Sequence, residues 1–160
     1  MQNNEVARNA SNEGGRPWLA RAAEGFGAGA IAGVCQSLIL WVFIQTGAPL
    51  FLGLMLAQPL TRHWLYQRAV WGGLWGLLFV LPLLRGQPGW KRGLVLGLAP
   101  AAGSLLYFNP YQNGNGFFGL KLGFGMPVMV VAFGLLWGLL AAFFYGRTQP
   151  RARVVKAEWV

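Results

Sequence analysis

Residues 71–78 read WGGLWGLL, and this stretch decides the kind of fold that the chain can adopt. Three glycines and two tryptophans lie in the middle of an apolar run, and no Asp or Glu occurs between residues 25 and 157. A shorter copy, LWGLL, returns at 136–140. Runs of this kind are typical of closely packed membrane helices, because small residues allow two helix backbones to approach each other in lipid.

The composition of the whole chain also indicates a membrane protein. Of its 160 residues, 55% are hydrophobic and 11% are charged, whereas soluble domains carry about 25% charged residues. A soluble domain of this length could not bury so much apolar surface, so we expect lipid to cover most of it. The net charge of +9 comes from Lys and Arg between apolar runs and at the chain ends. We therefore expect anionic lipids, and not nucleic acid, as binding partners.

Four segments have the composition of membrane-spanning helices, namely 25–46, 64–84, 90–108 and 127–145. A helix needs about 20 apolar residues to cross the hydrocarbon core. The third segment is the weakest, because it is short and contains Pro100. Two further apolar segments, 48–60 and 117–125, are too short to cross, so we expect each to be re-entrant or to lie flat. The sequence thus predicts an all-α integral membrane protein with four transmembrane helices.

The distribution of charge predicts the domains and the topology. We divide the chain into a polar cytoplasmic segment with a short interfacial helix (1–24), a membrane domain (25–146) and a basic tail (147–160). Four spans place both termini and the central loop on one side, where ten of the 13 Lys and Arg residues lie. Positive residues mark the cytoplasmic side, so we expect cytoplasmic termini and a bacterial inner (cytoplasmic) membrane. Four tail residues are candidate contacts to anionic lipid or to a partner: Arg147, Arg151, Arg153 and Lys156.

Three sequence patterns occur twice in the same order, at offsets of 64, 66 and 62 residues. The matched pairs are Gly29xxxGly33 with Gly93xxxGly97, FLGLML (51–56) with FFGLKL (117–122), and LWGLL (74–78) with LWGLL (136–140). We interpret them as an internal duplication, in which each unit contains a span, a short apolar segment and a second span. Chance similarity in a chain rich in Gly and Leu is the alternative. Units with an even number of spans are parallel, so the two hairpins would be related by a pseudo-two-fold axis along the membrane normal.

Glycines and a few polar residues inside the spans are the candidate packing and binding positions. Gln36, Trp75 and Trp137 fall near the middle of three different spans. An indole N–H within lipid needs an acceptor, and Gln offers one, so we hypothesise that the three meet in one polar layer. Tryptophans that only fill gaps opposite glycines are the alternative. The expected helix-packing positions are Gly29, Gly33, Gly72, Gly76, Gly93 and Gly97.

The chain offers few groups for catalysis. His63 is the only histidine and Cys35 the only cysteine, and no cluster of ligating residues has the spacing of a metal site. We therefore expect no enzyme activity, no metal and no cofactor. Arg62, His63 and Arg68 lie among aromatic residues, a mixture typical of the membrane–water interface. A ligand or quinone contact is the alternative for His63.

These observations predict a non-catalytic multi-pass membrane protein. Because no ionisable residue lies deep in the predicted spans, we expect an accessory, assembly or scaffolding subunit of a membrane complex. It would have a protein partner or form a homo-oligomer through its glycine faces. The first alternative is a small transporter or channel for a neutral or anionic solute, since an interior without carboxylates does not suit cations. The second alternative is a lipid-handling protein.

Overall fold

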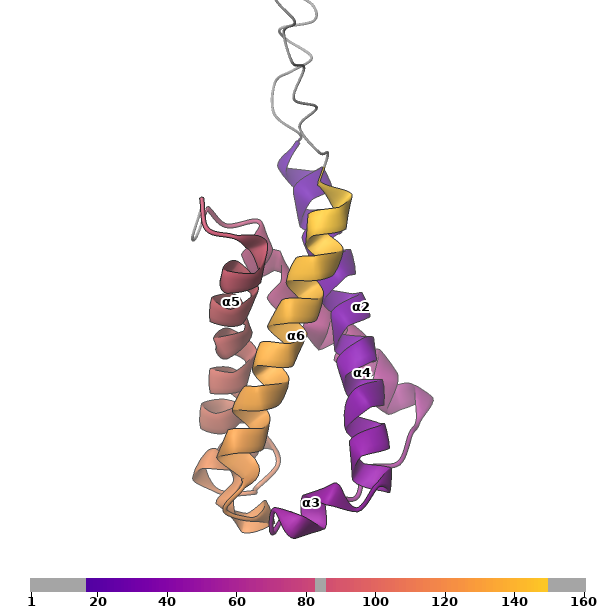
Figure 1. Ribbon diagram of the computed structural model, residues 1–160, viewed down its shortest axis with the longest axis vertical. Coiled ribbons are helices and arrows are strands. Elements are labelled where there is room, and N and C mark those ends of the chain that lie inside the picture. Colours follow the sequence, from indigo (N-terminus) through magenta and orange to yellow (C-terminus); the bar gives the residue numbers. More distant parts are fainter. Residues whose placement is uncertain (1–16, 83–85, 150–160) are drawn as a thin grey trace, which may run out of the picture.

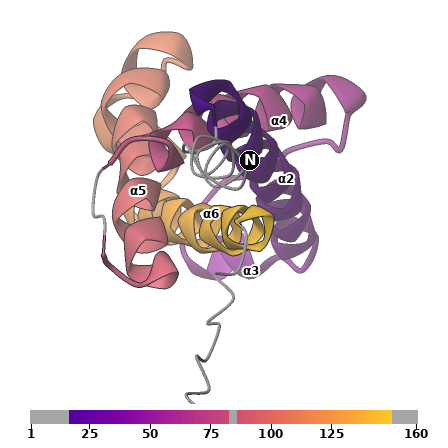
Figure 2. The ribbon, with the colours of Figure 1, turned by 90° about the horizontal axis from the view of Figure 1, so that it is seen from above.

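The chain is described here from a computed structural model, which covers residues 17–82 and 86–149. Within these residues every regular element is a helix, and no strand occurs. Two long helices, α2 and α6, lie side by side at one end of the molecule and separate toward the other end (Figure 1). A view along the bundle shows α6 between α5 and α2 (Figure 2). The all-α class that the sequence predicts is therefore confirmed.

Among the described residues, two helices are long and apolar enough to cross a membrane: α2 (Trp18–Gln45) and α6 (Met126–Thr148). At 1.5 Å per residue their 28 and 23 residues extend roughly 42 and 35 Å. Helix α2 begins at Trp18, directly after Pro17, and so unites the expected interfacial helix with the first predicted span. Pro127 lies in the first turn of α6, where a helix tolerates the missing N–H group.

The second and third predicted spans are helices that change type along their length. The α-helices are α4 (Arg62–Gly76) and α5 (Gly89–Gly103), and they continue as a 3₁₀ turn, η1 (Leu77–Phe79), and a π-helix, η2 (Ser104–Gln112). Pro100 lies inside α5 and Pro110 inside η2, and each removes one backbone donor. The third helical segment therefore continues past the end of the predicted span 90–108, as far as Gln112. Four complete spans are not shown. Unlike α2 and α6, neither α4 with η1 nor α5 with η2 is a helix long and apolar enough to cross a membrane.

Two short elements join the long helices at one end of the bundle. They are α3 (Ala48–Phe51) and the 3₁₀ element η3 (Phe117–Leu122), and α3 crosses that end in Figure 1. The Met55 N–H donates a hydrogen bond of 3.0 Å to the Leu122 carbonyl, so the two connections meet. The segments predicted as re-entrant or flat thus lie against each other across the end of the bundle.

Helices α2 and α4 pack through a seam of glycines. A Cβ atom on Gly29 would collide with the carbonyl oxygen of Gly72, and one on Gly76 would collide with that of Gly25. Gly33 lies in the same way against the backbone of Arg68. No side chain separates the two backbones along this seam. Four of the six predicted packing glycines are therefore brought together at one helix–helix contact.

Helices α5 and α6 pack through a second seam of the same kind. A Cβ atom on Gly93 would lie 2.5 Å from the Gly138 carbonyl oxygen, and one on Gly97 would collide with the carbonyl of Gly134. Gly93 and Gly97 are among the predicted packing positions, but their partners in α6 are not. The sequence contains the pattern that predicts these partners, since Gly134 and Gly138 are also four residues apart and therefore share a helix face.

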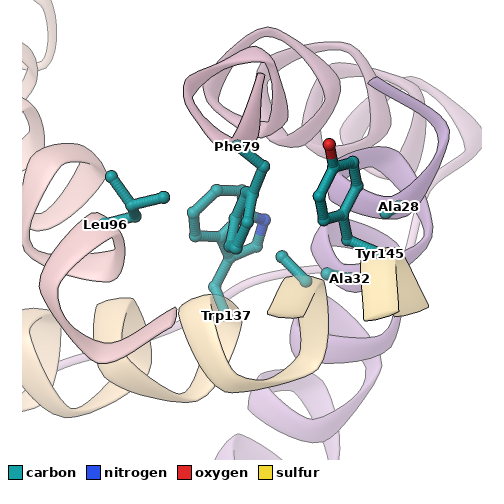
Figure 3. Close-up of a cluster of buried hydrophobic side chains, with 7 residues drawn as sticks. Ala28, Ala32, Phe79, Leu96, Trp137 and Tyr145 are labelled. Carbon is teal, nitrogen blue, oxygen red and sulfur yellow. The ribbon is translucent and has the colours of Figure 1, made fainter. Parts of the chain in front are cut away.

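A small apolar core lies between the two helix pairs. Trp137 and Phe79 lie next to each other, with a centroid distance of 6.4 Å, and Leu96 and Tyr145 flank them (Figure 3). Ala32 of α2 is fully buried against this cluster. Because Ala adds only a methyl group, α2 can approach α6 closely enough for the Trp137 indole to reach its backbone.

Candidate ligand-binding cavity

A cavity of about 630 Å³ lies between the α2–α4 pair and the α5–α6 pair. Its walls come from the second half of α2, most of α4, the end of α5 with η2, the first half of α6, and the connection that follows α3. This is the half of the bundle nearest α3. The volume lies within the range of about 300–1,000 Å³ that is usual for small-molecule sites.

The position of the glycines explains why the cavity is in this half. In α2 the seam ends at Gly33, and the next residues on the cavity side are Gln36 and Leu40. In α6 the seam begins at Gly134, and the cavity residues before it are large. Glycine contacts hold the backbones together in one half of the bundle, and larger side chains keep the helices apart in the other.

All three residues of the predicted polar layer line this cavity. The Gln36 Nε2 donates to the Phe133 carbonyl at 3.0 Å, and the Trp137 Nε1 donates to the Gly29 carbonyl at 3.2 Å. Both bonds join α2 to α6. The structure therefore brings these side chains to one cavity, but Gln36 and Trp137 bond to facing backbone carbonyls and not to each other.

Trp75 has different surroundings from Trp137, although both occupy the same position of the LWGLL pattern. Trp137 is only 3% exposed, whereas Trp75 is half-buried and lies against Gly103 of α5. A Cβ atom on Gly103 would be 3.1 Å from the Trp75 ring. One tryptophan thus closes the α2–α6 contact, and the other forms part of the cavity wall between α4 and α5.

The two walls of the cavity differ in polarity. The wall formed by α2 and α6 is mostly apolar, with Leu40, Ile44, Met126, Met129, Val130 and Phe133. The facing wall, formed by α4, α5 and η2, carries Gln67, Arg68, Ser104, Asn109 and Gln112. Among the described residues that line the cavity, Arg68 is the only charged one, and none is a carboxylate. The cavity therefore has one apolar wall and one wall that is rich in hydrogen-bond donors.

Arg68 was predicted as an interfacial residue, and the structure places it in the cavity wall. Its guanidinium carbon lies 5.6 Å from the centroid of the Trp64 ring, one turn earlier in α4. Trp64 is buried, so it provides a fixed surface on which the guanidinium rests. The Arg68 side chain remains accessible. A solute in the cavity can therefore reach a positive charge whose position is restricted by the aromatic ring.

Asn109 is a cavity residue that lies directly after the third predicted span, 90–108. It belongs to η2 and is 3% exposed. Its Nδ2 is buried and has no hydrogen-bond partner within the described part of the chain. Leaving such a donor unpaired costs on the order of 1–3 kcal/mol, so an orphaned buried amide is a feature that calls for an explanation. Because this atom has almost no accessible surface, the side chain would have to turn before an acceptor in the cavity could bond to it.

Local backbone geometry makes room for Asn109. Gly119 of η3 has φ of +72°, and a Cβ atom there would lie 3.2 Å from the Asn109 amide. The Asn109 carbonyl accepts a hydrogen bond of 2.8 Å from the Asn115 N–H, which holds the following turn against η2. The string NPYQNGNG resembles an ordinary turn, and no local signal in it predicts that its first residue is buried.

The other predicted interfacial residues lie outside the cavity. Arg62 and His63 are exposed in the first turn of α4, which Thr61 caps by accepting a 3.2 Å hydrogen bond from the Trp64 N–H. Of the predicted tail contacts, Arg147 lies in the last turn of α6, with its guanidinium 3.7 Å from the Phe143 ring centroid. The remaining tail positions, Arg151, Arg153 and Lys156, lie outside the described residues.

Two arginines donate hydrogen bonds to helix carbonyls. The sequence predicts for them only a role as positive charges that set the membrane topology. The Arg21 guanidinium donates to the Val80 carbonyl at 3.2 Å, and that of Arg92 donates to the Leu81 carbonyl at 2.8 Å and to the carbonyl of Phe79. These carbonyls lie at and just after the end of η1, which continues α4. The arginines therefore stabilise the C-terminal end of the α4–η1 column, where the helix dipole also favours positive charge.

Most of the polar side chains that line the cavity are of types that bind ligands, and few are of types that catalyse reactions. In the part of the chain that the structure describes, no three His, Cys, Asp or Glu residues are placed to hold a metal ion. The side-chain donors in the cavity are amides, indoles, a hydroxyl and a guanidinium, which recognise acceptor groups on a ligand. Comparison of the chain with protein-family models, with curated proteins and with solved structures finds no match.

Proposed function

We propose that this protein is a multi-pass membrane protein that binds a small neutral or anionic solute between its two helix pairs, as a small transporter or lipid-handling protein does. The observation that carries the proposal is the cavity, which has a buried amide donor without a partner. The absence of carboxylates among the described lining residues argues against a cation as the solute.

The two glycine seams support a duplicated architecture for this binding protein. Gly29 and Gly33 pair with Gly72 and Gly76, just as Gly93 and Gly97 pair with Gly134 and Gly138. In our proposal each pair is one hairpin of a four-span protein, and the solute binds where the hairpins meet. Parallel repeats of membrane transporters are arranged in this manner. With both termini in the cytoplasm, the cavity lies in the half of the bundle farther from the cytoplasm.

A cavity-filling substitution tests the proposed function. Ser104→Phe places a large ring in the cavity, whereas Ala102→Phe places the same ring on an exposed position of the same helix. We expect mass spectrometry of the protein purified in a mild neutral detergent to detect a bound small molecule in wild type and in Ala102→Phe. The molecule should be lost from Ser104→Phe at an unchanged elution volume. Equal occupancy in both variants, or no bound molecule in any of them, would contradict the proposal.

A second candidate function is an accessory or assembly subunit, and a different surface favours it. At the end of the bundle where α3 meets η3, the side chains of Phe51, Met55 and Phe124 are 93%, 82% and 90% exposed. A protein partner in the membrane would bury them. The test is purification of wild type beside Phe51→Ser and Phe124→Ser. A stoichiometric partner that the wild type retains and both variants lose would support this function, and a lone protein in all three would contradict it.

A further inference from the structure

We infer that the ligand of the cavity is an amphiphile with a single carboxylate or phosphate head, bound by Arg68 and Asn109, and with an apolar chain along α2 and α6. This inference rests on the proposed function and specifies the class of solute. It follows from the unequal polarity of the two walls, from the unpaired Asn109 donor and from the volume of the cavity.

The donor-rich wall predicts the chemistry of the head group. Arg68 offers a charged fork of N–H donors, and Asn109 offers a buried N–H with no acceptor within the described residues. Both groups need an acceptor, and an oxyanion is the acceptor that also balances the positive charge of Arg68. An ammonium group would have neither a carboxylate partner nor a favourable potential next to the guanidinium.

Aromatic contacts bring the two donor-bearing helices together. Trp71 of α4 and Phe108 of η2 meet edge to face, with ring centroids 5.0 Å apart. Trp71 is three residues from Arg68, and Phe108 is the neighbour of Asn109. This contact therefore holds the helix that carries Arg68 against the one that carries Asn109, and it places both donors on the same wall of the cavity.

The facing wall predicts an apolar chain. Met126 and Met129 of α6 and Leu40 of α2 line it, and the one amide there, Gln36, already donates to the Phe133 carbonyl. Methionine side chains are flexible and polarizable, so they adapt to a chain without a fixed shape. A ligand that was polar throughout would leave its own donors and acceptors unpaired against this wall.

The volume distinguishes an amphiphile from a free anion. Liquid water occupies roughly 30 Å³ per molecule, so a cavity of about 630 Å³ holds roughly 20 groups of that size. Acetate or inorganic phosphate would fill a small part of it and would leave the apolar wall facing water. A head group with a chain of about a dozen carbons amounts to roughly 15 such groups, so it occupies most of the cavity and covers the apolar wall.

Fluorescence quenching by brominated amphiphiles tests the inference, because Trp64, Trp71, Trp75 and Trp137 line the cavity. The probes are ω-bromoundecanoate and its uncharged analogue ω-bromoundecanol, added to the purified full chain in a neutral maltoside detergent. We expect saturable quenching by the acid, with binding of the alcohol weaker by about tenfold or more, since a hydrogen bond to a charged group contributes about 1.5–3 kcal/mol. Dodecyl phosphate should displace the acid, and inorganic phosphate or acetate at the same concentration should not.

Variants locate the head group. Arg68→Gln and the near-isosteric Asn109→Asp should each weaken binding of the acid about tenfold or more, and Arg68→Gln should leave binding of the alcohol unchanged. Arg62→Gln is the matched control, because Arg62 lies in the same helix, is exposed and does not line the cavity. Elution volume and helical circular dichroism check the fold. Since Arg68 is accessible, Arg68→Gln keeps the test valid if Asn109→Asp does not fold.

Each contrary result has a distinct meaning. Equal affinity for acid and alcohol, without dependence on Arg68, would overturn the anionic head group and leave the proposed cavity binding intact. Displacement of the probe by inorganic phosphate as effectively as by dodecyl phosphate would show a free-anion site and overturn the amphiphile. A lack of saturable quenching by any probe, together with no bound molecule in the purified protein, would overturn the proposed function as well.

Discussion

Gly29 and Trp137 together hold the two helix pairs against each other. The Gly29 backbone packs directly on Gly72 of α4, and its carbonyl accepts the hydrogen bond of the Trp137 indole from α6. One residue without a side chain therefore contacts both neighbouring helices. A carbonyl oxygen has two lone pairs, so Gly29 can accept the indole without giving up its helical hydrogen bond.

Trp137→Phe tests this contact. The substitution removes the indole N–H and part of the ring while it keeps an aromatic group beside Phe79. We expect the free energy of unfolding, measured in mixed micelles, to fall by about 1–3 kcal/mol from the lost hydrogen bond and the space left behind. Trp90→Phe is the control, because Trp90 is exposed at the start of α5. If both substitutions cost the same, the Trp137 bond does not contribute as proposed.

The helices are held in pairs by glycine seams, and the same seams limit where a cavity can form. The contacts of α2 with α4 and of α5 with α6 run over one half of the bundle only. Beyond Gly33 and before Gly134, larger side chains separate the helices. Glycine in a helix interior costs about 1 kcal/mol relative to Ala, and here close backbone packing offsets that cost.

Alanine substitutions at two glycines of α2 should have opposite effects. Gly29→Ala places a methyl group against the Gly72 carbonyl, and neither backbone can move without opening the seam. We expect it to lower the free energy of unfolding by about 1–3 kcal/mol or more. Gly27→Ala has open space around the new methyl group, so its higher helix propensity should raise stability by up to about 1 kcal/mol. Unfolding in mixed micelles measures both, and a loss of similar size at both positions would contradict the seam.

The whole molecule has two different ends. At the end where α2 begins and α6 stops, the Glu24 carboxylate accepts hydrogen bonds from Thr148 at 3.4 Å and from Gln149 at 3.3 Å. At the other end α3 meets η3, and the cavity lies in the adjacent half of the bundle. In our proposal the first end, which carries Arg21, Arg92 and Arg147, faces the cytoplasm.

Cysteine labelling tests this orientation. In a Cys35→Ser background, a cysteine at Asn113, near the cavity, should react with an impermeant maleimide added to intact cells. A cysteine at Gln149, at the end of α6, should react only after the membrane is made permeable. Both positions are outside the helices, so reactivity depends on the side of the membrane and not on burial in a helix seam. The reverse pattern would overturn cytoplasmic termini.

Local composition and spacing predicted the helical class and four membrane spans, of which two, α2 and α6, are long and apolar enough to cross a membrane. These features depend on neighbours a few residues apart, which a sequence displays directly. The type of helix at η1 and η2 was not predictable in this way. The chain continues as a π-helix through Pro110, where η2 contacts η3 and Phe108 contacts Trp71 of α4.

The sequence by itself determined the all-helical class and the glycine spacing along the helices, and it predicts lipid as the solvent because so much of the chain is apolar. The pairing of those glycines, the burial of Asn109 and the position of Arg68 in a cavity emerge only once the helices are packed. The glycine contacts between helices join residues more than 30 positions apart, as does the bond between Gly29 and Trp137. Such contacts depend on how the four helices pack together, and local patterns in the sequence do not predict that packing.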